Sequence, residues 1–597
     1  MKYFLLCFLL TLLAPAAFAK SALVLEAPGG DPVFTRAACA AAEMNSYEVE
    51  RRSVTEPGNW QAFDLVLFCD GACLPQSMLT DFWHFLNNGK QAVFFQAPAW
   101  ERPLVKINGR WTERSEYARR AAMTAPEHPI YDFRNGSCKS WKREAQETNG
   151  IMGWREAHDP SNGYYYYEFT ADFPGGYDYV HLDAGEGAFR QGDTVTVFTA
   201  QGDSHTTSIV AGWVEEDGSR WKKKTVLDTW RNIYYIEAED FEYAGGNDRR
   251  SGTVFDPSKA RRFFVGLDGS TDNTYRQHTF SIGALGTCPS TDNTRAMKPI
   301  NNTGMDYMSL GPDNAFFDMH DVASFEAPGV TAKPDMPRSM KSSHMRPSAA
   351  GYGKKRDWRW LSWSVCRTAE GKWRGNPAAG LVRFDNAQKY SRYAAIAVRD
   401  RDWYAKPSTH KYIAAVIGSM DRGVYIQSAG ADRFTYMEGQ PVTVGADLRN
   451  VSGEQRRIAW RITVTDNSTG ARLFDRREEY TLEPRGRMDR SFELPVKRWT
   501  AAGCRVTVNV SMDGLLIDTV SHDFYQWKPA SGEPFVTVKN GRFYKGDREL
   551  KFHGVNYHPT CTTSSWNWAL FLEWFGKDFY DPEVIERDLS NMNGLGI

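Results

Sequence analysis

Near the start of the chain, short hydrophobic runs alternate with helical patterns. Apolar runs of strand length lie at residues 22–25, 47–49, 63–68 and 91–95, and helices are predicted at 33–42 and 78–86. Strands and helices that alternate over short connections are typical of a parallel sheet covered by helices. Residues 21–150 are therefore predicted to form the first part of an α/β domain.

From residue 151 to 288 the pattern changes to short strands between turns that contain Gly and Asp. The strands are predicted at 164–169, 194–199, 208–214, 224–227, 232–236, 263–267 and 277–282. Seven short strands at this spacing predict a jelly-roll β-sandwich.

Residues 426–530 show a second series of strands, in which apolar and polar positions alternate. These strands are predicted at 441–450, 458–466, 479–482, 488–494, 505–512 and 516–524. Their lengths and turns are typical of an immunoglobulin-like β-sandwich.

Between the two sandwiches, residues 352–425 return to a mixed pattern. Strands are predicted at 358–365, 378–384 and 394–398, and a helix at 411–420 that ends before Gly423. We predict that 21–150 and 352–425 are two halves of one α/β domain with the jelly roll inserted, because insertion requires only that the ends of a surface loop lie close together. Two unrelated small domains in series are the alternative. Residues 289–351, rich in Asp, Asn, Ser and Pro, are predicted to be a linker.

The last segment, residues 531–597, begins with a hairpin signature. Short strands at 535–538 and 542–544 flank Asn540-Gly541, a pair typical of two-residue hairpin turns. The mostly apolar run at 550–557 then predicts a strand that is buried on both faces, as in a parallel sheet.

A helix is predicted after this strand. Asp581 can cap it, Pro582 suits its first position, and Gly594 ends it. Its apolar positions Val584, Ile585, Leu589 and Met592 share one face. Strand, loop and helix in this order predict the truncated start of a (β/α)8 barrel, because a complete barrel needs ~250 residues. The predicted fold class is thus multidomain, α/β plus all-β.

Composition narrows the function classes. The chain has 597 residues, with 72 Lys and Arg against 73 Asp and Glu, so the basic surface of a nucleic-acid-binding protein is not expected. Aromatic residues make up 14%, including 20 Trp, which suits both sandwich cores and sugar-stacking surfaces. No Cys and His cluster has the spacing of a zinc site.

The first 19 residues have the pattern of a cleavable signal peptide. Lys2 precedes an apolar run at 3–13, and Ala17-Phe18-Ala19, with small residues at its first and third positions, forms a cleavage site. The run is too short to span a bilayer, and no later segment is long enough. The chain is therefore predicted to be exported, to the periplasm or the medium, without a membrane span.

The barrel-like segment also resembles a known family. KFHGVNYHP and YDPEVIERDLSNMNGLGI resemble the first βα unit of the clan A glycoside hydrolases, the retaining barrel enzymes that include the family 5 and family 2 types. The resemblance implies a carbohydrate substrate and two catalytic glutamates, on the fourth and seventh strands of the barrel. Neither strand lies in this chain, so no catalytic residue is assigned here.

Two further resemblances concern the other domains. LTDFWHFLNNGKQAVFF and GNPAAGLVRFDNAQKYSRYAAIAVRDRDWY resemble class I amidotransferase-like, flavodoxin-like domains. The turn FCDGACLP contains no G-x-C-x-G elbow, so this domain is predicted to be catalytically silent, with Cys69 and Cys73 as core or paired cysteines.

Within the jelly roll, GDTVTVFTAQGDSHTTSIVAGWVEEDGSRW and QHTFSIGALG resemble galactose-binding-like domains. Such domains bind sugars through loop aromatics and sometimes hold a structural calcium, the one cofactor that the resemblance allows. A purely structural role stays open, because the sequence does not show whether 164–167 or Trp221 face solvent.

Candidate substrate-binding residues follow from the barrel resemblance. The active sites of barrels lie at the carboxyl ends of their strands, which places Asn556, Tyr557 and His558 at the mouth, with Trp566 and Trp568 on the loop above. A Trp ring there could stack on a pyranose, or these residues could only fix and pack the loop. The predicted function is that of a secreted glycoside hydrolase with a retaining two-carboxylate mechanism in the full-length protein. The alternative is a non-catalytic carbohydrate-binding or cell-surface adaptor protein.

Overall fold

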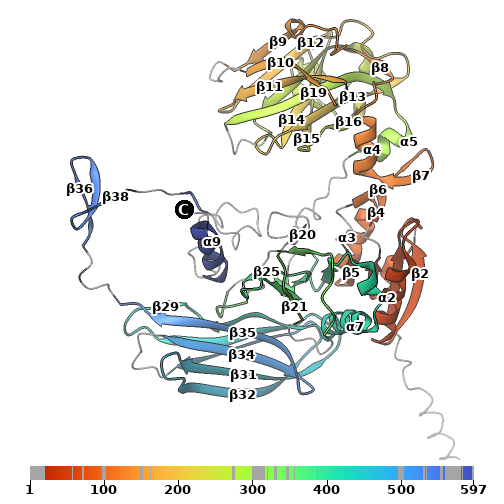
Figure 1. Cartoon of the computed structure of the whole chain (residues 1–597). Coiled ribbons are helices and arrows are strands. Elements are labelled where there is room, and N and C mark those ends of the chain that lie inside the picture. The colour runs from red at the N-terminus through yellow and green to blue at the C-terminus, as the bar shows by residue number, and fades with distance from the viewer. Residues whose placement is uncertain are drawn as a thin grey trace, which may run out of the picture. The chain divides into compact units, whose positions relative to one another are not determined.

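A computed structural model describes most of the chain between residues 20 and 594. The description leaves out residues 57, 70–72, 97–101, 147–151, 162, 272–275, 299–315, 319–320, 328–332, 344–348, 355–356, 386–387, 495–502, 529–531, 533, 552–554, 558–579 and 581. The described chain is mostly β, and it divides into two compact units (Figure 1). The first contains residues 1–74, 78–101 and 302–597, and the second contains residues 75–77 and 102–301. The predicted signal peptide, 1–19, lies outside the described residues.

The first unit is built on a seven-stranded sheet. Its strands, in spatial order, are β2 (Tyr47–Ser53), β1 (Lys20–Glu26), β3 (Leu65–Phe68), β5 (Gln91–Phe95), β27 (Arg392–Ile396), β26 (Ala378–Arg383) and β23 (Trp358–Ser362). The first five are parallel, and β26 runs antiparallel to β27 and β23. Because β5 pairs with β27, segments 301 residues apart in the chain form one sheet.

Helices cover this sheet. They are α2 (Pro32–Glu43), α3 (Leu79–Asn87), α6 (Arg401–Tyr404) and α7 (Pro407–Arg422). Helix α2 starts where Asp31 accepts a hydrogen bond from the Val33 amide, and Gly423, with φ 66°, ends α7 in the left-handed conformation. Small side chains on α2, such as Ala38 and Ala41, are fully buried, which lets α7 pack closely beside it (Figure 1).

The first unit also contains a sandwich of two antiparallel sheets. One has the order β28 (Val424–Ala431), β30 (Val442–Asn450) and β33 (Arg487–Leu494). The other has the order β29 (Thr435–Tyr436), β35 (Leu515–Gln526), β34 (Cys504–Met512), β31 (Arg456–Asp466) and β32 (Arg472–Leu482), with β29 parallel to β35. Alternate residues such as Trp460, Ile462, Val506 and Val508 point into the shared core. The strands predicted for residues 441–524 are confirmed.

A buried ion pair joins the seven-stranded sheet to this sandwich. The guanidinium of Arg359, on β23, donates to Asp518 Oδ2 at 2.5 Å and to the Ile426 carbonyl at 2.9 Å. Asp518 also accepts from the Ile426 amide at 2.8 Å. The two charged side chains are only 7% and 10% exposed, so each is neutralised by the other rather than by water.

Short strands lie in and beside the predicted linker. They are β20 (Phe316–Asp318), which pairs with β22 (Lys341–Ser343), and the sheet of β21 (Ser324–Glu326), β24 (Val365–Arg367) and β25 (Trp373–Gly375). The single strand predicted at 358–365 is divided into β23 and β24. The chain turns between them because the amides of Trp363 and Ser364 both donate to the Ala378 carbonyl.

The end of the chain agrees with the sequence in part. The predicted hairpin is confirmed as β36 (Val536–Lys539) and β37 (Arg542–Lys545), joined by Asn540 and Gly541 at φ 51° and 73°. The predicted helix is α9 (Pro582–Gly594). The buried parallel strand predicted at 550–557 is wrong in its described parts.

Leu550 instead closes β38 (Arg548–Leu550), which pairs antiparallel with β37 across a second tight turn. Residues 555–557 are not in a strand, and the Val555 side chain is 53% exposed. A local antiparallel partner is reached through a short turn, whereas a parallel partner requires a long crossover, so Leu550 pairs with its neighbour.

The second unit is a sandwich of two larger antiparallel sheets. The β11 sheet has the order β10 (Met152–Asp159), β11 (Tyr164–Asp172), β19 (Gln277–Pro289), β13 (Asp193–Gly202) and β16 (Asn232–Glu237), with β8 (His128–Pro129) on β19. The β14 sheet has the order β17 (Glu242–Gly245), β15 (Arg220–Val226), β14 (Ser208–Glu215), β18 (Ala260–Asp268), β12 (Tyr177–Asp183) and β9 (Trp141–Ala145). Their facing aromatic side chains, among them Tyr167, Phe169, Trp213 and Phe263, form the core.

This unit begins well before the predicted boundary at residue 150. The segment from β6 (Arg102–Ile107) and β7 (Arg110–Glu113) to α4 (Arg114–Ala121) packs, together with α5 (Asp292–Ala296), on the outer face of the β11 sheet. Apolar residues of β13 and β16 on that outer face, such as Val197 and Ile233, are therefore buried. β4 (Cys73–Pro75) lies where the chain passes between the units.

The remaining short helices are 3₁₀ turns at Trp60–Ala62, Gln76–Met78, Cys138–Ser140, Ala238–Asp240, Asp248–Arg250 and Pro257–Lys259. Among all the helices that the structure describes, none has the length and apolar character needed to cross a membrane.

Replacement of Arg359 tests the buried ion pair. Arg359→Met leaves the Asp518 carboxylate buried without its countercharge, so the free energy of unfolding should fall by about 3–5 kcal/mol. The matched control is Arg457→Met, which removes an exposed pair with Glu479 and should cost less than about 1 kcal/mol. Urea unfolding followed by fluorescence measures both; equal losses would contradict the assigned role of Arg359.

Candidate functional site

The outer face of the β14 sheet carries a row of aromatic side chains. Along β12, Tyr177, Tyr179 and His181 alternate with Val180 and Leu182, which belong to the sandwich core. The three outer residues therefore point away from the core, on the same side of the sheet. We refer to this surface, formed by Tyr177, Tyr179, His181, Phe264, Lys222 and Asp268, as the Tyr179 face.

Two glycines allow close packing between the strands of this face. Gly266 on β18 lies directly opposite Tyr179, and Gly212 on β14 lies opposite Phe264. A Cβ at Gly212 would stand 2.4 Å from Phe264 Cζ, and one at Gly266 would stand 2.9 Å from Tyr179 Cα. Because Gly212 has no side chain, the Phe264 ring lies close against the backbone of β14, and because Gly266 has none, the backbone of β12 lies close to β18.

One polar group on the face is centred on Asp268. Its Oδ2 accepts hydrogen bonds from Lys222 Nζ at 2.7 Å and from the Tyr179 hydroxyl at 3.0 Å. Burial raises the pKa of the Asp268 carboxyl, but the bonds from Lys222 and Ser270 outweigh that effect and leave the pKa below its usual value. Asp268 is therefore a fixed, ionised acceptor, while the Lys222 side chain stays 32% exposed.

A second polar group lies beside His181. Arg220 donates to Glu144 Oε1 at 2.6 Å, and Glu144 Oε2 is 3.2 Å from His181 Nε2. Burial, reinforced by Arg262 and Arg220, lowers the pKa of His181 to about 4, although Glu144 acts in the opposite direction. The imidazole is therefore neutral near pH 7, and one nitrogen can donate while the other accepts.

These features give the face an apolar floor and a polar rim. Phe264, Tyr179 and His181 are 2%, 8% and 6% exposed, although they point away from the core. Tyr177 is half-buried, and its ring stacks 5.6 Å from that of Tyr179. Such a surface can hold a ligand that has both an apolar ring face and several hydroxyl groups.

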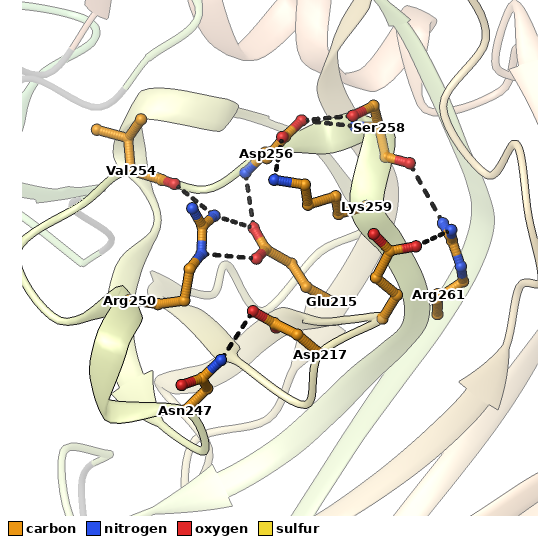
Figure 2. Close-up of polar contacts among 10 residues, drawn as sticks. Glu215, Asp217, Asn247, Arg250, Val254, Asp256, Ser258, Lys259 and Arg261 are labelled. Carbon is orange, nitrogen blue, oxygen red and sulfur yellow. Dashed lines mark hydrogen bonds and ion pairs between the residues drawn. The ribbon is translucent and has the colours of Figure 1, made fainter.

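Figure 2 shows a separate polar network in the same sandwich, centred on Glu215. Both oxygens of Glu215 accept from the Arg250 guanidinium, at 2.8 and 3.1 Å, and Oε1 also accepts from the Asp256 amide at 2.8 Å. Around this centre, Asn247 donates to Asp217, and Arg250 donates to the Val254 carbonyl. The network holds the loop before β18 against the turn that follows β14.

This network does not suit a calcium ion. The Glu215 side chain is fully buried, and the Arg250 cation already compensates its charge. Over the described part of the chain, no group of three or more His, Cys, Asp or Glu residues is arranged to hold a metal. A structural calcium elsewhere in this sandwich stays a prediction from resemblance.

The residues predicted to bind substrate are described only in part. Asn556 is exposed, and Tyr557 is half-buried, with its hydroxyl donating to Asp588 on α9 at 2.8 Å. His558, Trp566 and Trp568 lie outside the described residues. The structure thus ties Tyr557 to the helix that follows it, and the substrate-binding roles of all five residues stay predictions.

Cys69, directly after β3 of the seven-stranded sheet, and Cys73, at the start of β4, are both buried. A left-handed residue stands at a strand end of this sheet, as in a nucleophile elbow, but it is Gln96, with φ 67° directly after β5. A glutamine amide is not a nucleophile, so this elbow-like turn cannot start covalent catalysis.

The structure also settles which aromatic residues of the sandwich face outward. Trp221 and Tyr167 are buried in the core, whereas Tyr164 and Tyr166 are half-buried on the outer face of the β11 sheet. Sequence reasoning missed the Tyr179 face. The signal was present in the alternation of Tyr177, Tyr179 and His181 with apolar residues, but Lys222 and Asp268 reach the face from other strands.

Comparison with known proteins gives no family assignment. No family model matches the chain, and no curated protein does. A family 11 carbohydrate-binding module of a Clostridium thermocellum cellulosomal cellulase is similar at 12% identity and a TM-score of 0.23, over 28% of this chain and 97% of the module.

Two agarases are similar over smaller shares of their own length. An exo-beta-agarase matches at 11% identity and a TM-score of 0.21, over 28% of this chain and 26% of the agarase. The agarase AgWH50C matches at 9% identity and a TM-score of 0.21, over 39% and 42%. At these values the likenesses assign neither a fold nor a function to this chain.

The depressed pKa of His181 predicts a pH-dependent stability. The unfolded chain takes up the proton with a pKa of about 6.5 and the folded chain at about 4, so the free energy of unfolding should fall as the pH decreases from 6.5 to 4. His181→Asn should flatten this part of the profile, measured by urea unfolding across that range. The exposed His205→Asn is the control, and an unchanged profile in the His181 variant would refute the assignment.

Proposed function

We propose that the sandwich of the second unit binds a carbohydrate chain on the Tyr179 face. The observation that carries this proposal is the combination of stacked rings with the fixed Asp268 and Lys222 pair. A sugar ring presents an apolar CH surface to an aromatic ring, and its hydroxyls can accept from the partly exposed Lys222 ammonium, which Asp268 holds in place. The galactose-binding-like resemblance of the sequence supports the same function.

The face is suited to an extended ligand rather than to a small enclosed one. Its groups come from several adjacent strands, with Tyr177 on β12, Lys222 on β15 and Asp268 at the end of β18. A ligand that lies across these strands contacts rings and charged groups in turn. We therefore propose a poly- or oligosaccharide as the ligand.

We propose further that this binding serves glycoside hydrolysis in an exported enzyme of the retaining type. The support is the resemblance of residues 551–559 and 580–597 to the first βα unit of clan A hydrolases. In such an enzyme Asn556, Tyr557, His558, Trp566 and Trp568 would contact substrate, and the catalytic carboxylates would come from later strands. In the alternative, a carbohydrate-binding adaptor protein would use the same binding face but would not hydrolyse the polysaccharide.

Tyr177→Ala tests the binding face. Loss of the half-buried ring should weaken binding of the recognised polysaccharide by about five-fold or more, because a central aromatic contact of an interface typically contributes over ~1 kcal/mol. The measurement is affinity electrophoresis against a panel of plant and algal polysaccharides, followed by calorimetry. The control is Tyr525→Ala, an exposed tyrosine of the other sandwich.

Undiminished binding by the Tyr177 variant would rule out the Tyr179 face. Release of reducing ends from the bound polysaccharide, assayed with the protein that carries a complete barrel, separates the hydrolase from the adaptor. An adaptor would bind the polysaccharide and release none.

A further inference from the structure

An arginine stacked on tyrosines marks a second surface of the sandwich, on the outer face of the β11 sheet. The Arg231 guanidinium lies 3.8 Å from the ring centre of Tyr164 and 5.3 Å from that of Tyr166. The two rings are nearly parallel, 6.0 Å apart with an interplanar angle of 24°. This sheet is the one opposite the Tyr179 face, so the two surfaces are on different sides of the sandwich.

The stacked arginine has unused hydrogen-bonding capacity. Within the described part of the chain, its guanidinium makes no hydrogen bond, and its charged neighbour is the Asp159 carboxylate at 3.7 Å, beyond hydrogen-bond distance. The Arg231 side chain is nevertheless only 16% exposed, because the tyrosine rings cover one side of it. A guanidinium has five N–H donors in a planar fork, so donors held here in a fixed plane remain available to a ligand.

The platform beneath the arginine is rigid. The Tyr164 hydroxyl is hydrogen-bonded to Thr199 on β13, and Gly283 on β19 provides the space for it, since a Cβ there would stand 2.2 Å from that hydroxyl. Burial raises the pKa of Tyr164 to about 12, so its ring remains an uncharged phenol. A pre-positioned guanidinium loses little conformational entropy when it binds.

Neighbouring contacts hold the loop that carries Arg231. Trp230 is stacked against Arg119 of α4 at 4.9 Å, and Gln201 donates to the Thr229 carbonyl at 2.9 Å. Helix α4 packs over β16, at one edge of the sheet, whereas Tyr164 and Tyr166 lie on β11 toward the other edge. The loop therefore places Arg231 beside the covered part of the face rather than beneath it.

We propose that Arg231 binds an oxyanion carried by an acidic sugar, either a carboxylate or a sulfate ester. The guanidinium fork matches such groups with paired charge-assisted hydrogen bonds, and the half-buried Tyr166 ring offers an apolar surface for the sugar itself. The site does not depend on the Tyr179 face. Arg231 would thus form a second carbohydrate-binding site on the sandwich, one that binds charged rather than neutral sugar units of a glycan.

The test compares variants of the full chain on three immobilised polymers. These are alginate for carboxylates, dextran sulfate for sulfate esters and unmodified dextran as the neutral control. Wild type should be retarded by at least one acidic polymer and not by dextran, and binding should weaken with added salt. Which acidic polymer binds identifies the oxyanion.

Arg231→Gln should reduce this binding by about ten-fold, and Arg231→Lys should restore it only in part, because a lysine lacks the planar fork. The matched control is Arg155→Gln, which removes a 77% exposed arginine paired with Glu168 on the same sheet and should leave binding unchanged. Near-ultraviolet circular dichroism and retained binding at the Tyr179 face establish that each variant is folded.

Either of two results would overturn the proposal. One is a wild-type protein that binds neither acidic polymer, and the other is an equal loss in the Arg231 and Arg155 variants, which would indicate attraction by overall charge. Undiminished polysaccharide binding by Tyr177→Ala, together with loss of acidic-polymer binding in Arg231→Gln, would refute the proposed function and leave this inference standing.

Discussion

The parallel pairing of β5 with β27 is the constraint on which the first unit depends. Parallel neighbours need a long connection, and here that connection contains residues 102–301, which are all of the second unit except residues 75–77. Until residues 392–396 pair with β5, the edge of β5 that faces β27 has no strand partner. Helix α2 also lacks its packing partner α7, which follows β27 in the chain. The seven-stranded sheet therefore closes only after the chain returns, which makes it a structure of high contact order that should form slowly.

The same return of the chain fixes the adjoining sandwich. Arg359 lies on β23, the last strand of the sheet, and its ion pair with Asp518 exists only when both the sheet and the sandwich are formed. A buried pair of this kind contributes little net energy compared with apolar packing, but it strongly disfavours arrangements that separate its members. Its physical effect is thus to specify one packing of the two elements.

The sequence predicted local structure where the residues of one segment were sufficient to define a strand or a turn. The periods of the apolar residues located most strands of the two sandwiches, but not others such as β9, β10, β12, β17 and β28, and Asn540-Gly541 located the hairpin turn. The strand predicted at 550–557 failed because apolar character alone does not say which neighbour is available to pair. The Tyr179 face could not be predicted for a related reason: Tyr177, Lys222 and Asp268 lie about 45 positions apart along the chain, and only the register of four strands brings them together.

The network around Glu215 bears on how the order of this sandwich depends on dissolved ions. Many loops of sandwich domains are organised by a dissolved cation, so their order varies with the concentration of that ion. Here the positive charge belongs to Arg250, which is part of the chain, cannot be chelated and does not titrate near neutral pH. The conformation of the loop that Arg250 holds should therefore not depend on the concentration of calcium or other divalent cations.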